Sequence, residues 1–204
     1  MSTHDDIRTF FTLPLDFSLL ELEPETGVDP VRYFCTPKNA ELIGWGSSGT
    51  HFILLPGEET VYCVEPELGE EGTYVLPVGA DFREFLSYLL FCQCTSPLAQ
   101  IFKLDEARFR RLLRDNAAST WPGCEGDFQR WDASLALLAE TFQIQPQDPF
   151  QRAKKLQAAF DPKVLVFSDA YYDTLGLDRP GGEGRGTLLE FPPVEFRSPE
   201  KREE

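Results

Sequence analysis

Apolar side chains recur with helical spacing after residue 81. They occupy positions i, i+3, i+4, i+7 and i+8: Phe82, Phe85, Leu86, Leu89 and Leu90. A helix would place all five on one face, and such a face must be buried. Asp81 is a suitable N-cap because its carboxylate can accept from the free N–H groups of the first turn. Glu84, three residues later, can bond back as in a capping box.

Three extended segments separated by turns precede this helix: His51–Leu55, Thr60–Val64 and Tyr74–Leu76. A glycine-rich turn precedes the first segment, Pro56-Gly57 separates the first two, and an acidic loop separates the last two. Within the second segment apolar and mixed positions alternate, which is typical of a strand covered on one face. We therefore expect antiparallel strands that pack by one face on the helix after Asp81.

The rest of the chain is predicted from weaker signals. Apolar runs favour a strand or extended segment at residues 15–22, a short strand at 31–35 and a late strand at Lys163–Phe167. Helices are expected after Asp105, from about Asp127 to Pro146, and after Asp148-Pro149, where a proline follows an N-cap.

These elements predict an α+β fold, with a mostly antiparallel sheet packed on a helix and an appended helical C-terminal region. We expect a single α+β domain over residues 1–177, sheet-rich in 1–80 and helix-rich in 81–177. Residues 178–204, which begin with a glycine-rich, linker-like run, are expected to form a flexible or loosely docked tail.

The order of motifs over roughly residues 30–92 resembles the SUKH superfamily, also called the Smi1/Knr4-like domain. The matching pieces are Gly46–Gly49, His51–Leu55, Thr60–Val64, Glu65–Glu71 and the Phe-x-x-Phe-Leu start at Phe82–Leu86. The resemblance implies a non-enzymatic binding module, and many bacterial members look like immunity proteins that neutralise toxins, often basic nucleases. Members usually open with a helix, for which this sequence gives no clear signal.

Charge limits the partners that this chain can bind. The net charge of −15 is uneven: residues 1–90 carry 16 acidic and 4 basic side chains, a net of −12, and residues 91–204 carry 18 and 15, a net of −3. Nucleic acid and anionic membrane are poor partners for the first part, because both need clustered Lys and Arg. A basic protein would be attracted to it, although acidity that serves solubility alone is an equally good explanation.

Cysteine and histidine usage predicts no metal site and no cofactor. The five cysteines are an odd number, and only Cys92 and Cys94 are close in sequence. With two histidines in the chain, the usual zinc ligand sets are not available, and buried free thiols are expected. Because residues 1–6 lack the layout of a signal peptide, we expect a cytoplasmic protein.

Catalytic signatures are weak. Gly44, Gly46 and Gly49 have the spacing of a dinucleotide-binding loop, but a strand follows them where that loop needs a helix. His51 lies near Ser47 and Ser48, but no triad spacing is recognisable, so a structural hydrogen bond is the favoured role. We predict that the protein is not an enzyme. A small hydrolase or ligand-binding enzyme using Gly44–His51 is the less favoured alternative.

The candidate partner-binding residues are one tryptophan and the acids of the two turns: Trp45, Glu58, Glu59, Glu65, Glu67, Glu70 and Glu71. The acids are expected to be solvated, because turns run over the surface, and several are expected to point the same way from one end of the sheet. Trp45, between two glycines, is either a core residue or an exposed anchor. The predicted function is protein binding, as an immunity-like protein or as a cytoplasmic scaffold or regulatory protein.

Overall fold

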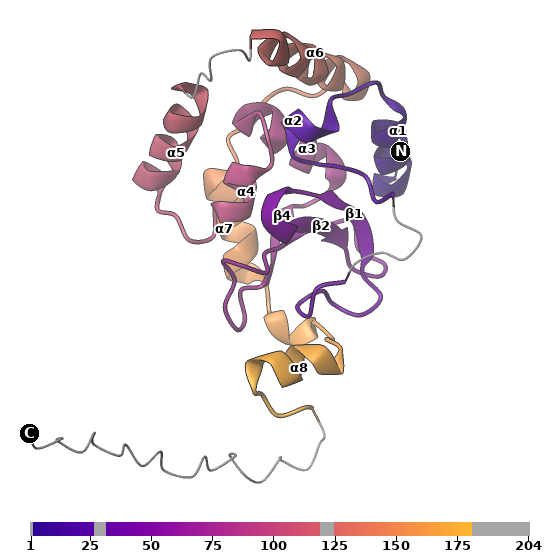
Figure 1. Ribbon diagram of the computed structural model, residues 1–204, viewed down its shortest axis with the longest axis vertical. Helices are drawn as coiled ribbons and strands as arrows, with labels where there is room; N and C mark the ends of the chain where they lie inside the picture. The colour runs from indigo at the N-terminus through magenta and orange to yellow at the C-terminus, as the bar shows by residue number, and fades with distance from the viewer. Residues whose placement is uncertain (1, 27–31, 119–124, 181–204) are drawn as a thin grey trace, which may run out of the picture.

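The fold is α+β, with one four-stranded antiparallel sheet and α-helices that make up about half of the chain. The computed structural model describes residues 2–26, 32–118 and 125–180. Figure 1 shows the sheet at the centre, with α8 at one end of the molecule and α6 at the other. The strands are β1 (Glu41–Trp45), β2 (His51–Leu54), β3 (Val61–Val64) and β4 (Val75–Gly79). The helices are α1 (Thr3–Thr12), α2 (Phe17–Leu20), α3 (Phe82–Cys92), α4 (Ser96–Gln100), α5 (Glu106–Ala118), α6 (Glu125–Phe142), α7 (Phe150–Ala159) and α8 (Asp169–Leu175).

The sheet is a meander in the order β1-β2-β3-β4. The three predicted strands are confirmed as β2, β3 and β4, whereas β1 was missed because it contains part of the glycine-rich run. The register shifts between Leu42 and Gly44, so the strand carries a bulge there. A Cβ at Gly44 would lie 2.9 Å from the carbonyl oxygen of Glu23, which explains why glycine is needed at this close approach.

Both faces of the sheet are buried, so the prediction of a sheet covered on one side is wrong. Side chains of β2 and β3 alternate between two apolar clusters. Phe52 and Cys63 face the helices of the main core, whereas Ile53 and Val64 face a second cluster. The second face is covered by the turn around Tyr33–Ala40 and by the segment from Phe160 to Leu177. The turn directly precedes β1, whereas the segment from Phe160 to Leu177 lies far from the strands in sequence, so the strand pattern gave no sign of it.

Helix α3 is the predicted helix, and it lies at the centre of the main core. Asp81 Oδ1 accepts a hydrogen bond from the backbone N of Glu84 at 2.8 Å, as predicted. The return bond differs: the Glu84 carboxylate accepts from the backbone N of Ala80 at 2.6 Å instead of from Asp81. All five apolar residues of the predicted face are buried. A Cβ at Gly79 would lie 3.0 Å from the backbone nitrogen of Phe85, so β4 and α3 touch backbone to backbone.

The N-terminal segment is helical where a strand was expected. Helix α1 opens the chain with a capping box between Ser2 and Asp5, and Asp16 caps the short helix α2. The strand or extended segment expected at residues 15–22 is wrong for Phe17–Leu20, which form α2 with apolar residues that pack on the main core. Asp6 of α1 is buried and accepts two hydrogen bonds from the Arg83 guanidinium, at 2.7 and 2.9 Å.

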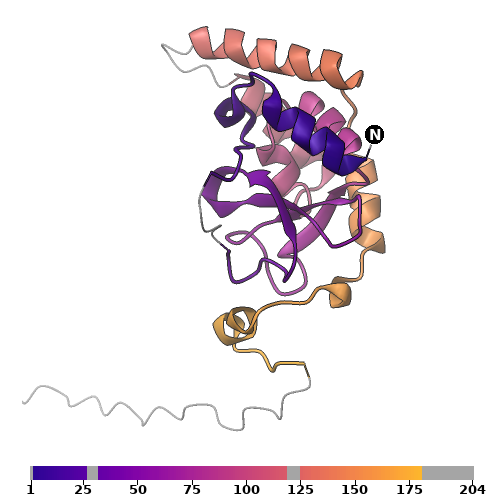
Figure 2. The same ribbon diagram turned by 90° about the vertical axis from the view of Figure 1, so that its right-hand side faces the viewer.

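The C-terminal helices follow the prediction more closely. Asp105 Oδ1 accepts from the backbone N of Arg108 at 2.8 Å at the start of α5. Helix α6 runs across the end of the molecule distant from α8 (Figure 2), and α7 begins one residue after the Asp148-Pro149 signal.

The strands predicted at residues 31–35 and 163–167 are not formed in the described residues. Residues 32–35 form a turn, while residue 31 lies outside the described residues. Residues 163–167 are not a strand: a 3₁₀ turn at Pro162–Val164 leads into extended chain that makes one backbone hydrogen bond, from Lys38 N to Val166 O at 2.7 Å. In the predicted tail, Arg179 forms ion pairs with Asp169 and Asp173 of α8, and residues 181–204 lie outside the described part. No helix in the described ranges has the length and apolar character needed to cross a bilayer.

We expect Phe85→Ala to destabilise the protein by about 3–5 kcal/mol, because it leaves a cavity where α3 meets the sheet. The Phe85 ring is fully buried, with its centroid 5.0 Å from that of Phe52. Urea unfolding measures the loss, and Leu68→Ala, at a side chain that is 39% exposed, is the control, with an expected change within about 0.5 kcal/mol. Equal unfolding midpoints for the two variants would contradict the place given to Phe85.

Candidate functional site

The candidate site is the end of the sheet where β3 leads into β4 through the loop at residues 65–74. The register pairs Trp45 with His51, His51 with Val64, and Val64 with Val75, so all four lie at this end. The hairpin turn that carries Glu58 and Glu59 joins the other ends of β2 and β3. The acids of the two turns therefore lie at opposite ends of the sheet, as successive turns of a meander do, and those that share the β3–β4 end are the acids of the longer loop.

The acids of the hairpin turn have structural partners. The carboxylate of Glu58 accepts a hydrogen bond from the Tyr62 hydroxyl at 2.5 Å. That of Glu59 accepts from the backbone N of Thr3 at 2.8 Å. Hydrogen bonding by Thr3, first through its side chain and then through its backbone, lowers the pKa of Glu59. These hydrogen bonds fix the turn to β3 and to α1 at the other end of the sheet, so neither acid belongs to the candidate site.

Three acids of the longer loop are solvent-exposed and uncompensated. In the described ranges, no Lys, Arg or His side chain forms an ion pair with Glu67, Glu70 or Glu71. Several acids of the helical part are instead paired, as Glu84 is with Arg152 and Asp16 with Arg130. The prediction of solvated loop acids is confirmed for these three residues.

Glu65 was expected on the surface but is buried, with 4% of its area exposed. The Thr50 hydroxyl donates to one carboxylate oxygen at 2.7 Å, and the backbone N of Leu68 lies 3.4 Å from the other. The sequence could not reveal this burial, because it depends on the Ser47–Gly49 turn and helix α4 closing over the start of the loop.

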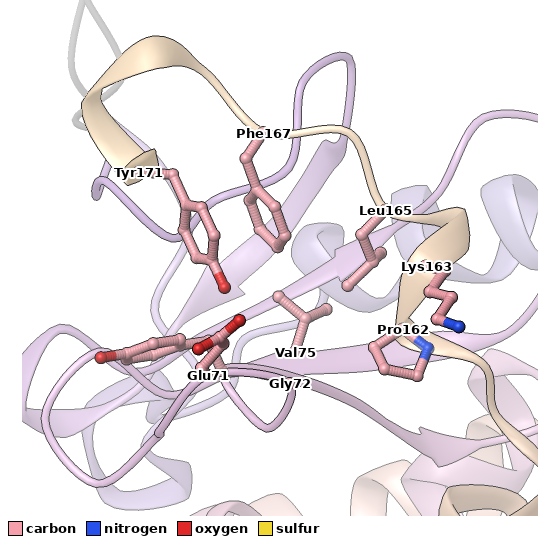
Figure 3. Close-up of a pocket in the computed structure, with 9 residues that line it drawn as sticks. Glu71, Gly72, Val75, Pro162, Lys163, Leu165, Phe167 and Tyr171 are labelled. Carbon is pink, nitrogen blue, oxygen red and sulfur yellow. The ribbon is translucent and has the colours of Figure 1, made fainter. Parts of the chain in front are cut away.

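A cavity of about 360 Å³ lies beside the second half of the loop. Aromatic rings form much of its wall: Phe167 stacks on Tyr171 with centroids 3.9 Å apart, and Tyr74 meets Tyr171 edge-on at 6.1 Å. Figure 3 shows the Tyr171 hydroxyl and the Glu71 carboxylate on one side of the opening and Lys163 on the other. Burial, followed by the charge of Glu71, raises the pKa of Tyr171. The cavity thus offers an apolar interior with charged groups at its rim.

Trp45 is half-buried and held in place. Its ring centroid lies 4.8 Å from that of His51 and 6.1 Å from that of Tyr33, and its indole Nε1 donates to the Glu25 carboxylate at 2.8 Å. The residue therefore matches neither a fully buried core residue nor a freely exposed anchor. It is a fixed aromatic surface at the same end of the sheet as the loop.

His51 is buried, and both of its ring nitrogens are engaged. Nε2 lies 3.0 Å from the Thr36 hydroxyl and Nδ1 lies 2.9 Å from the carbonyl oxygen of Gly49. Because Gly49 O can only accept, Nδ1 carries the proton and Nε2 accepts from Thr36. Burial lowers the pKa of His51 from 6.5 to about 4. This arrangement fits the predicted structural role and leaves neither nitrogen free for a substrate.

Cysteines and potential metal ligands offer no further chemistry in the described part of the chain. Cys35, Cys63, Cys92 and Cys94 are free and buried, as predicted, while Cys124 lies outside the described residues. Burial raises the pKa of Cys35 and of Cys94 to about 12, which keeps both thiols protonated and unreactive. No group of three or more His, Cys, Asp or Glu side chains in the described ranges is placed to hold a metal ion.

Sequence reasoning missed the far wall of the aromatic cavity, which comes from residues 162–171. The available signal was the density of aromatic residues in Phe167–Tyr172, which exceeds what a short helix needs for its own packing. Their position beside the acidic loop could not be read from the sequence.

Comparison with known proteins adds no relative: no family model matches the chain, and no curated protein or solved structure is significantly similar to it.

We expect the stability of the protein to fall between pH 6.5 and pH 4 in part because of His51. The folded-state pKa of about 4 lies below the ordinary value of 6.5, so the unfolded chain takes up a proton in this window while the folded protein does not. One pH unit in this window is worth about 1.4 kcal/mol, which makes the loss between pH 7 and pH 5 about 2 kcal/mol. Urea unfolding at these two pH values should show this component in the parent and not in His51→Gln. Equal losses in both proteins would rule out the assignment.

Proposed function

We propose that this protein is a protein-binding module that holds a basic partner at the β3–β4 end of its sheet. The observation that supports the proposal is the combination of uncompensated carboxylates with an aromatic-lined cavity on one loop. Glu70 and Glu71 lie on the exposed part of that loop, and Glu71 also lines the cavity.

Two energetic contributions follow from this surface. The exposed carboxylates attract a cationic partner over about 8 Å at physiological ionic strength and raise the rate of encounter. The cavity removes an apolar side chain of the partner from water, and a buried anchor of this kind carries much of the affinity in protein interfaces. The half-buried ring of Trp45 extends the apolar contact area at the same end of the sheet.

The finer proposal is an immunity-like protein that neutralises a basic toxin. It is supported by the resemblance of residues 30–92 to the SUKH superfamily and by the excess of acidic side chains in residues 1–90. We also propose a cytoplasmic location, supported by four cysteines that are free in the fold, since reducing compartments keep thiols unpaired.

We expect Glu70→Lys/Glu71→Lys to slow association with the partner by about tenfold or more at low salt, because electrostatic steering raises on-rates by that order. The partner is first captured on the immobilised full chain and identified, and stopped-flow association is then measured with the purified protein at two salt concentrations. The difference between parent and variant should shrink as salt screens the charges.

Asp132→Lys/Glu140→Lys is the matched control, since it makes the same charge change at exposed positions of α6, away from the loop. Its on-rate should stay closer to that of the parent than the loop variant does. Equal on-rates for the two double variants would mean that net charge alone acts, and the β3–β4 end would lose its assigned role.

A further inference from the structure

A second, polar cavity of about 210 Å³ lies at the first half of the same loop, where the Ser47–Gly49 turn and the start of α4 meet it. The volume equals that of about seven water molecules in the liquid. The lining includes the carboxyl groups of Glu65 and Glu67 and no Lys, Arg or His side chain. It therefore differs in chemistry from the aromatic cavity, although both are built on residues 65–74.

Glu65 is a buried acid without a cationic partner in the described part of the chain. One of its oxygens accepts from Thr50, while the other has only the N–H of Leu68, at a distance of 3.4 Å. Buried carboxylates are normally paired with a cation or fully hydrogen-bonded, because the charge loses its hydration. Glu65 is thus left with capacity to bind a donor from outside the chain.

Both threonine hydroxyls of the lining already donate to other groups, whereas the hydroxyls of Ser47, Ser48 and Ser96 can each donate and accept. The Thr50 hydroxyl donates to Glu65, and the Thr95 hydroxyl donates to the carbonyl oxygen of Glu21 at 2.5 Å. The amide nitrogen of Gln100 donates to the Ser96 hydroxyl at 3.2 Å, which leaves the Gln100 carbonyl oxygen free to accept. A hydroxyl has one proton and two lone pairs, so the threonine oxygens offer acceptors only. Because the lining holds two carboxylates and no cationic side chain, it is matched by a ligand that carries a positive charge and N–H donors.

The geometry points to this cavity as a site for an organic cation, a primary ammonium or a guanidinium, with Glu65 as its buried counter-charge. Such groups supply three or five N–H donors, which suits one carboxylate surrounded by neutral acceptors. Calcium or magnesium would need six or more oxygen ligands, with more carboxylates among them. Glu67, which is exposed, adds a second negative charge at the mouth of the cavity.

The cation has two possible sources. The first is a Lys or Arg side chain of the basic partner, and this source rests on the proposed function. The second is a free alkylamine or alkylguanidine, which needs no protein partner. The chemistry recognised is the same in both cases, and the experiment separates them.

The test is a titration of the full chain with N-butylguanidinium chloride at constant ionic strength, followed by the NMR shifts of the Thr50 and Leu68 amides. The neutral analogue N-butylurea has nearly the same shape and is titrated in parallel. We expect saturable shifts with the cation and none with the urea. Glu65→Gln should weaken binding by about tenfold or more, as the loss of a charged hydrogen bond does.

Glu140→Gln is the matched control, because it removes one exposed charge of α6 outside the lining of either cavity, and its affinity should stay within about twofold of the parent. Glu67→Gln, at an exposed side chain, provides a variant that keeps the fold if Glu65→Gln unfolds, with an expected loss of about threefold. Equal binding of cation and urea, or equal affinities for parent, Glu67→Gln and Glu65→Gln, would overturn the assignment.

A short end-capped peptide whose only charged group is one arginine identifies the source of the cation. Tighter binding than N-butylguanidinium supports a partner side chain, and equal or weaker binding supports a free cation. The titration uses no partner protein, so its failure removes only the cation site. If the cation binds but no basic protein is captured by the full chain, the proposed function fails and the site stands.

Discussion

The close approach of α3 to the sheet is the constraint on which the rest of the fold depends. Gly79 leaves no side chain between β4 and the backbone of Phe85, and the apolar face of the helix is therefore buried completely. The polar residues of α3 then hold other elements: Arg83 binds Asp6 of α1 and the Phe142 carbonyl at the end of α6, and Glu84 forms an ion pair with Arg152 of α7. Helix α3 thus packs on the sheet through its apolar face and binds α1, α6 and α7 through its polar side chains.

This arrangement separates the charges of the protein into two groups. In the helical part several acids form ion pairs with arginines, as Asp6 does with Arg83 and Glu106 with Arg110. In the described residues no basic side chain forms an ion pair with the exposed acids of the β3–β4 loop, so their negative charge stays available. Net repulsion within such a loop lowers stability slightly and favours contact with a positive surface.

Local patterns predicted the parts of the fold that local interactions determine. The spacing of Phe82 to Leu90 and the cap at Asp81 gave α3, and alternation in Thr60–Val64 gave β3. The errors arose where distant segments meet: the second face of the sheet is covered by Phe160–Leu177, and Glu65 is enclosed by Thr50 and α4. For the site, the exposed acids were predictable because turns lie on the surface. The aromatic wall of Phe167 and Tyr171 was not predictable, because it depends on residues 162–171 packing beside the β3–β4 loop.

The late cover of the second sheet face has a consequence for synthesis of the chain on the ribosome. All four strands and α3 are complete by Cys92, whereas Tyr171, which packs on that face, is made about 80 residues later. At elongation rates of about 5–20 residues per second this interval lasts roughly 4–16 s. During that time Ile53, Val64 and Val75 have only the turn around Tyr33–Ala40 as cover on this face. The nascent sheet therefore presents part of an apolar face to water until the segment from Phe160 to Leu177 has been made, and such transient exposure favours aggregation.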